Sequence, residues 1–309
     1  SGKLFPVSNK ARDVRDRLLA FARSRGADVR FDARLAGLAT SRVGWRLELE
    51  GGESLEARAV VIATGGLSVP TTGSDGGGLA LVERLGHTMH PTYPALTPLT
   101  TGAARWTELS GVSLDARLVS PPETPRYNRR QGLLFTHRGF SGPAVLNISH
   151  VFTRPREGAP PALLAQWGGL SRAEWELEFS AGGRAQLATV LRRQLPERLV
   201  LALLEEAGVP ADRMLAQLRR DERERALDAL TALPLPVSGS EGYRKAEVTG
   251  GGVALSDIDP VTMESRRTPG LFLCGEILDA FGPIGGYNFL WAWATGRAAG
   301  LGARRRLTS

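Results

Sequence analysis

The sequence predicts an α/β protein in which a discontinuous domain is interrupted by a β-rich insertion. Two apolar runs of strand length, residues 59–63 and 271–274, are each followed by glycine, as in buried strands that end beside a ligand. The second run leads into a helix rich in small residues. Between the two runs lie short alternating segments broken by Gly and Pro, which are typical of β structure.

The first 58 residues predict one helix followed by short strands. Apolar positions at helical spacing run up to Gly26, which ends the helix. Strands are expected at residues 29–31, 35–38, 45–49 and 54–58, with Gly51 and Gly52 forming the turn of a hairpin.

The strand at residues 59–63 ends in Thr64, Gly65 and Gly66, where glycine allows the main chain to approach a ligand. A tight turn at a strand end is the alternative. A second glycine run, residues 76–78, precedes a helix that stops at Gly86. The proline-rich segment HPTYPALTPL then predicts an extended crossover out of the first domain.

The middle of the chain divides by texture into two parts. Residues 96–184 predict a β-rich inserted domain, and residues 185–244 predict a helical segment with the linker PLPVSG leading back. A strand interrupted by Gly250, Gly251 and Gly252 then rejoins the first domain. The first domain therefore comprises residues 1–95 and 245–309.

The stretch GLFLCGEILDAFGPIGGYNFLWAWATGRAAG predicts a ligand site. An acidic residue, Glu276, follows the strand and Gly275, where it can accept hydrogen bonds from ribose or ribityl hydroxyls. Gly285 and Gly286 leave bare N–H groups at a helix start, which favour an anionic ligand. Ala292, Gly296 and Gly300 recur at a spacing of four and can lie against a flat group. A glycine-rich connection before a core helix is the alternative.

Composition limits the partners. The chain has 309 residues, a net charge of +7 and a sequence pI near 10.2, yet its arginines alternate with acids as on a solvated helix face, so nucleic acid is not expected as a partner. The single Cys274 excludes an internal disulfide. No metal-ligand spacing and no apolar run long enough to span a membrane are found in the sequence, and we expect a cytoplasmic protein.

Four segments carry a family resemblance: ATGG with TTGSDGGG, LFTHRGFSGPAVL, EVTGGGVALSDIDPVTMESRRTPGLFLCGE and GPIGGYNFLWAWATGRAAG. Together they resemble the YhiN-like flavoproteins, the BaiN/RdsA family of NAD(P)/FAD-dependent oxidoreductases. The resemblance implies a glutathione-reductase-like FAD-binding domain with an inserted β-barrel-like domain and a helical segment. Family members begin with G-x-G-x-x-G, which this sequence does not contain, so we expect an N-terminally truncated form.

The resemblance also implies which residues contact FAD. The expected cofactor-binding residues are Leu35, Thr64, Gly65, Gly66, Gly251, Gly252, Gly275, Glu276, Gly285, Gly286, Tyr287 and Asn288. No catalytic acid or base is assigned, because His137, the only histidine inside a family motif, has no partner identifiable from spacing and is better explained as structural. Packing is likewise the better explanation of Trp291 and Trp293.

The sequence is compatible with three functions. The first is an FAD-dependent oxidoreductase that passes hydride through flavin N5 between NAD(P)H and an unidentified organic small molecule. The second is an RNA-associated flavoprotein, suggested by the arginine excess. The third is an apo, truncated form that acts only as a binding module. Oligomeric state and the choice between NADH and NADPH are not predicted.

Overall fold

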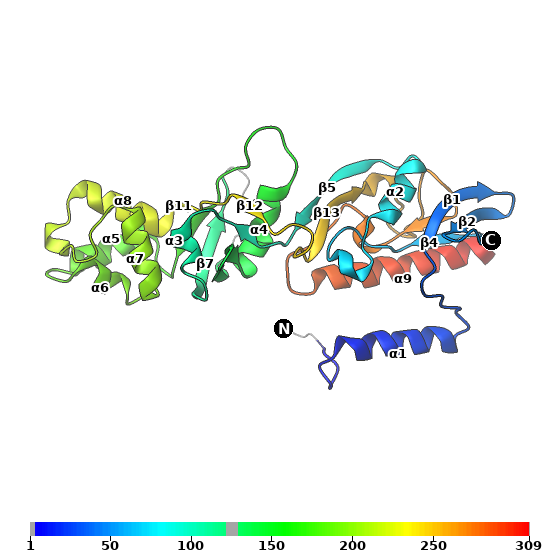
Figure 1. The fold of residues 1–309 in the computed structure, drawn as a ribbon, viewed down its shortest axis with the longest axis horizontal. Coiled ribbons are helices and arrows are strands. Elements are labelled where there is room, and N and C mark those ends of the chain that lie inside the picture. The colour runs from blue at the N-terminus through cyan, green and yellow to red at the C-terminus, as the bar shows by residue number, and fades with distance from the viewer. Residues whose placement is uncertain (1–3, 122–128, 309) are drawn as a thin grey trace. The chain divides into compact units, whose positions relative to one another are not determined.

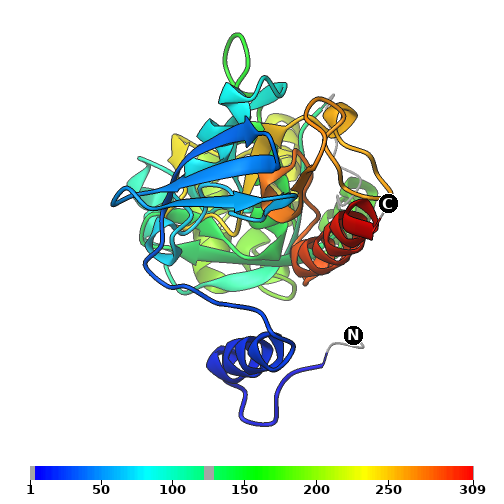
Figure 2. The same ribbon diagram turned by 90° about the vertical axis from the view of Figure 1, so that its right-hand side faces the viewer.

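The computed structural model describes residues 4–121 and 129–308. The chain divides into two compact units, Ser1–Ala57 and Arg58–Ser309, which are described separately below. Figure 1 labels the elements of both units, and the colours of Figure 2 follow the same order along the chain. The domain boundaries expected at residues 96, 185 and 245 stay a prediction.

The first unit consists of a helix and an antiparallel three-stranded sheet. The helix carries Asp13 in its first turn and Arg23 in its last, which suits the helix dipole. The prediction of a strand at residues 29–31 is wrong: these residues lie outside the assigned strands and Phe31 is exposed. Three residues cannot form a strand without a neighbour to bond. The elements are α1 (Ala11–Ser24), β1 (Leu35–Ser41), β2 (Gly44–Leu49) and β3 (Ser54–Ala57).

The second unit brings the two apolar runs together. Strand β4 (Val60–Ile62) pairs in parallel with β14 (Leu271–Leu273), with Val61 opposite Phe272. Both apolar runs therefore form strands as predicted, although Val61 is exposed on one side of its strand. The carboxyl ends of the two strands lie side by side, so the loops that follow them meet.

A second strand pair lies beside the first. Strand β5 (Met89–Ala95) pairs antiparallel with β13 (Val248–Val253), and the register shifts between Gly250 and Gly252. The proline-rich segment therefore forms a strand rather than only a crossover. A two-stranded pair leaves the outer edge of β5 unpaired, where proline is tolerated. Between these pairs the chain forms η1 (Pro70–Thr72) and the predicted helix α2 (Gly77–Arg84).

The middle of the chain forms an antiparallel sheet of seven strands in the order β11-β10-β7-β8-β9-β6-β12. Its core contains the stacked rings of Trp106, Phe135 and Trp167, all buried. The predicted linker contributes β11 and β12, so it belongs to the sheet. The strands are β6 (Leu99–Thr100), β7 (Ser113–Val119), β8 (Gln131–Thr136), β9 (Gly139–Ser141), β10 (Leu164–Trp167), β11 (Leu233–Pro234) and β12 (Gly239–Ser240), with helices α3 (Ala104–Thr107) and α4 (Pro143–Thr153).

The helical segment predicted after residue 185 is observed, and it begins earlier than expected. Ser171 and Glu174 form a capping box that starts a helix inside the stretch predicted to be β-rich. Arginines of the helix at residues 220–231 form ion pairs with acidic residues; for example, Arg225 Nη1 lies 2.9 Å from Asp221 Oδ2. The elements are α5 (Arg172–Ala181), α6 (Leu187–Leu191), α7 (Glu197–Glu206), η2 (Leu215–Gln217) and α8 (Arg220–Thr231).

The chain ends with η3 (Leu255–Asp257), η4 (Gly275–Ile277) and the long helix α9 (Tyr287–Thr308), drawn in red in Figures 1 and 2. Helix α9 buries Thr295, Ala299 and Gly302, whereas the small residues Gly296 and Gly300 have no protein atom near an added Cβ among the described residues. Among the helices of residues 4–121 and 129–308, none is long and apolar enough to cross a membrane.

Candidate functional site

The site is built where the loops after β4 and β14 meet. Gly65 and Gly275 adopt φ values of +73° and +78°, a conformation that side chains rarely tolerate, so each strand turns sharply at its carboxyl end. Gly78, the second residue of α2, packs on Thr64, whose Oγ1 would lie 1.9 Å from an added Cβ. Glycine at these positions is therefore required by the turn and by close packing.

A hydrogen-bond network surrounds the carboxylate of Glu276. Oε1 accepts a hydrogen bond from Ser68 Oγ and another from Thr249 N–H at 3.1 Å. Thr249 Oγ1 in turn accepts from the N–H groups of Leu67 (2.7 Å) and Ser68 (3.1 Å). Gly66 lies against this network, since an added Cβ would be 2.4 Å from Thr249 Oγ1. Glu276 is half-buried and is held by donors from two segments of the chain, the β4 loop and strand β13.

Helix α9 holds the other side of the β14 loop. The buried N–H of Gly275 donates to Thr295 Oγ1 at 2.9 Å, and Trp291 Nε1 donates to the carbonyl of Gly275 at 3.0 Å. Trp291 and Thr295 are four residues apart and so share one face of the helix. The expectation that Trp291 serves packing is therefore incomplete, because its indole N–H fixes the loop beside Glu276.

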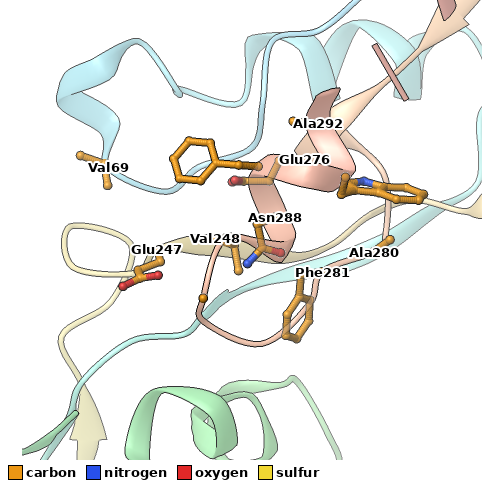
Figure 3. A pocket seen from close by; sticks show the side chains of 12 residues that line it. Val69, Glu247, Val248, Glu276, Ala280, Phe281, Asn288 and Ala292 are labelled. Atoms are coloured by element: carbon orange, nitrogen blue, oxygen red, sulfur yellow. The ribbon is translucent and has the colours of Figure 1, made fainter. Parts of the chain in front are cut away.

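A cavity of about 510 Å³ opens at the start of α9. Figure 3 shows Val69, Glu247, Asn288 and Phe281 around it, with Glu276 beside Asn288. The first helical hydrogen bond of this region runs from Leu290 N–H to Gly286 O, so the preceding N–H groups belong to the unpaired first turn. The lining residues are Val69, Glu247, Val248, Glu276, Ala280, Phe281, Gly285, Gly286, Asn288, Phe289, Trp291 and Ala292.

A second cavity, of about 530 Å³, also borders Glu276. Glu276 and Ala292 line both cavities. Its lining consists of Ala63, Gly65, Cys274, Gly275, Glu276, Ala292, Trp293, Gly296 and Arg297. The small residues of α9 that were expected to lie against a flat group thus include Ala292 and Gly296, both on this cavity.

The loop before α9 is held by side-chain amides. Asn288 Oδ1 accepts from Gly282 N–H at 2.8 Å, and Asn288 Nδ2 donates to Gly282 O at 3.1 Å. Ile284 N–H donates to Asn147 Oδ1 at 2.8 Å. Gly285 and Gly286 follow at φ +120° and +95°. This loop forms one wall of the first cavity.

The predicted cofactor residues divide by location. The first cavity contains Glu276, Gly285, Gly286 and Asn288, and the second contains Gly65, Gly275 and Glu276. Tyr287 is exposed at the start of α9, and Thr64 and Gly66 lie in the β4 loop. Leu35 belongs to strand β1 of the first unit. Contact of any of these residues with a cofactor stays a prediction.

Gly251 and Gly252 have a different environment. Both are buried, and added Cβ atoms would lie 2.2 Å from Pro91 O and 2.5 Å from Ile277 O, respectively. Neither residue belongs to the lining of the two cavities described above. Close backbone packing is thus sufficient to explain why glycine stands at these two positions.

Two buried titratable groups, His87 and Cys274, are structural. Burial lowers the pKa of His87, whose ring nitrogens lie 3.0 Å from Val82 O and 2.7 Å from Ser265 Oγ. Burial raises the pKa of the Cys274 thiol, which keeps it protonated. His137, by contrast, is exposed in the turn between β8 and β9.

Sequence reasoning missed four residues of the site: Ser68, Thr249, Trp291 and Thr295. Ser68 and Thr249 are 181 positions apart, so no local pattern could join them. The sequence did indicate the two residues of α9, because Trp291 and Thr295 are four positions apart and so lie on one face of the helix that follows β14 and Gly275.

Residues 1–302 match the family described as HI0933-like protein Rossmann domain. The chain is 34% identical over 303 residues to the ribosomal RNA dihydrouridine synthase of Escherichia coli (strain K12), covering 95% of this chain and 72% of that protein. The enzyme of the same name from Haemophilus influenzae is 36% identical over 255 residues, which span 81% of this chain and 61% of that relative. The 3-dehydro-bile acid delta(4,6)-reductase of Clostridium scindens is 30% identical over 312 residues, with coverages of 99% and 76%.

These matches confirm the family resemblance, the Rossmann-type α/β fold and the class of flavin-dependent oxidoreductase. They contradict one prediction. The expectation that nucleic acid is not a partner is wrong, because two relatives are named for a reaction on ribosomal RNA. The paired arginines of α8 were interpreted correctly as a solvated face, but a substrate nucleotide can be recognised by a cavity without a basic helix.

Proposed function

Because the chain belongs to the HI0933-like Rossmann family, we propose that it is an FAD-dependent reductase of a carbon–carbon double bond conjugated with a carbonyl group. We further propose that its substrate is a uridine in RNA and that NAD(P)H supplies the hydride. An RNA substrate agrees with the cytoplasmic location expected above.

The names of the relatives share one reaction type. A dihydrouridine synthase saturates the C5–C6 bond of uracil, and a delta(4,6)-reductase acts on double bonds of a 3-oxo steroid. In each substrate a ring carbonyl can withdraw electrons from a double bond. Hydride then adds to the carbon remote from the carbonyl, and a proton adds to the adjacent carbon. The preference for RNA rests on the two relatives with the higher identities, 34% and 36%.

The first cavity supports the assignment of the flavin ring. Its walls are largely apolar and aromatic, including Phe281 and Trp291, which suits a flat ring system. Gly285 and Gly286 lack Cβ atoms at the helix start, and the N–H groups of the first turn favour negative charge there. A flavin bound with N1 and the C2 carbonyl toward the helix start would place there the edge of the ring that gathers negative charge on reduction. Its N5 would supply the hydride.

The residues around Glu276 suit the polar part of the cofactor. A carboxylate between two cavities can accept hydrogen bonds from hydroxyls that run from one cavity to the other. Ser68 and Thr249 orient Oε1 by donating to it, which leaves Oε2 as an acceptor for a ribityl hydroxyl. The observation that carries the proposal is this continuity: apolar cavity, helix start and oriented carboxylate adjoin one another.

Reconstitution with FAD tests the proposal. We expect thermal unfolding of the chain to shift upward with increasing FAD, because a ligand that binds only the folded state stabilises it. The complex should oxidise NAD(P)H and add two hydrogens to uridine in a ribosomal RNA fragment, detected by mass spectrometry. A melting temperature that does not change when FAD is added would instead support the apo binding-module hypothesis. Reduction of a 3-oxo-4,6-diene steroid, with no change in RNA, would overturn the choice of substrate.

A further inference from the structure

Helix α4 of the antiparallel sheet region reaches the loop that forms one wall of the first cavity. We infer that Asn147 is a positioning residue for the Gly285–Gly286 segment, and thus for the flavin ring. The inference rests on the proposed function, but the contact that carries it is independent of any ligand. It assigns the inserted region a direct part in shaping the cofactor site.

Asn147 joins two segments through both atoms of its side-chain amide. Oδ1 accepts from Ile284 N–H at 2.8 Å, and Nδ2 donates to Gln131 Oε1, also at 2.8 Å. The N–H of Ile284 fixes which way the Asn147 amide points, because a flipped amide would present a donor to this donor. Asn147 is only 7% exposed, so water cannot readily replace either bond.

Apolar contacts reinforce this anchor. The Phe281 ring lies edge-on to Tyr93 and to His150, with ring centroids 6.4 Å and 5.6 Å apart. Ile284 packs on the cluster that contains Tyr93 and Val248. His150 lies three residues after Asn147 on α4, so one face of this helix contacts the loop at two points.

The anchors matter because of the glycines that follow. Gly285 and Gly286 have positive φ values, and glycine loses more conformational freedom than other residues when it is ordered. Asn288 holds Gly282 from the α9 side, and Asn147 holds Ile284 from the α4 side. Loss of the α4 anchor would free the segment just before the helix start, where its N–H groups must face the ring.

Three variants of the full chain separate positioning from general stability. Asn147→Leu removes both hydrogen bonds and keeps the number and branching of the side-chain heavy atoms, whereas Asn147→Asp keeps an acceptor for Ile284 N–H. Thr153→Val is the matched control, because Thr153 lies on the same helix and donates to Pro94 O at 2.7 Å rather than binding the loop. Hydrogen exchange of the peptide covering residues 280–286 reports the loop without FAD, and titration with FAD reports the cavity.

We expect Asn147→Leu to speed exchange of this peptide about tenfold and to raise the Kd for FAD by a similar factor, since the partly buried N–H of Ile284 loses its partner. Asn147→Asp should restore slow exchange, and Thr153→Val should change neither quantity. Unchanged exchange in Asn147→Leu, or equal effects in Asn147→Leu and Thr153→Val, would overturn the inference. If the unmodified chain binds no FAD, the proposed function fails, while the exchange data still decide whether Asn147 positions the loop.

Discussion

Replacement of Gly66 by alanine tests how tightly the β4 loop is packed on the Glu276 network. The added Cβ would lie 2.4 Å from Thr249 Oγ1, 2.6 Å from Thr249 Cβ and 3.0 Å from Glu276 Oε1. The two distances to Thr249 are too short for a real contact, so Thr249 must move. Thr249 cannot move without disturbing its bonds to the N–H groups of Leu67 and Ser68.

Overpacking of this kind costs about 2 kcal/mol of the free energy of unfolding. That loss corresponds to a fall in Tm of roughly 4–8 °C for a protein of comparable size. Gly102→Ala is the control, because nothing lies within 4 Å of an added Cβ there. Differential scanning calorimetry of both variants provides the comparison. Equal melting temperatures for Gly66→Ala and Gly102→Ala would show that the loop yields and that the network is not rigid.

Further predictions concern the supports of the site. Thr295→Val leaves the buried N–H of Gly275 without its acceptor and should lower the free energy of unfolding by about 1–3 kcal/mol in urea titrations, whereas Thr295→Ser should retain most of it. Burial lowers the pKa of His87, so the folded state favours the neutral ring. The contribution of His87 to the free energy of unfolding is therefore complete above the unfolded pKa of about 6.5 and is lost as the pH falls below that value. His87→Gln should flatten this dependence between about pH 5 and 7, and an unchanged slope would exclude His87 as its source.

The fold was predictable where local patterns suffice. The uninterrupted apolar runs at residues 59–63 and 271–274 predicted two strands, and β4 and β14 form there; that these two strands pair with each other is a finding of the structure. Local pattern failed where a neighbour decides. Residues 29–31 have a strand-like composition, but among the described residues no strand pairs with them. Strand β5, in contrast, accommodates prolines because its outer edge is unpaired. The capping box of Ser171 and Glu174 was readable in the sequence and was overlooked.

The candidate site was predictable in its glycines and its carboxylate, but not in what surrounds them. Glu276 and the pair Gly285–Gly286 follow from a strand, a turn and a helix start that are contiguous in sequence. The donors that orient Glu276 come from segments far away along the chain, and their proximity depends on the whole fold. The alternation of arginines with acids misdirected the choice of partner, because this pattern does not tell whether a nucleotide is held by a basic surface or by a cavity.

The central claim is that the cavity at the start of α9 holds the flavin ring. Its most direct test is the Kd for FAD of Ala292→Leu, which places a larger side chain in the cavity from an exposed helix position. Ala294→Leu is the matched control, since Ala294 is also exposed on α9 but lines another pocket, which shares only Trp291 with the first cavity. Fluorescence titration should show at least tenfold weaker binding for Ala292→Leu and unchanged binding for Ala294→Leu, a difference of about 1.4 kcal/mol or more. Unimpaired binding of FAD by Ala292→Leu would place the flavin elsewhere and contradict the claim.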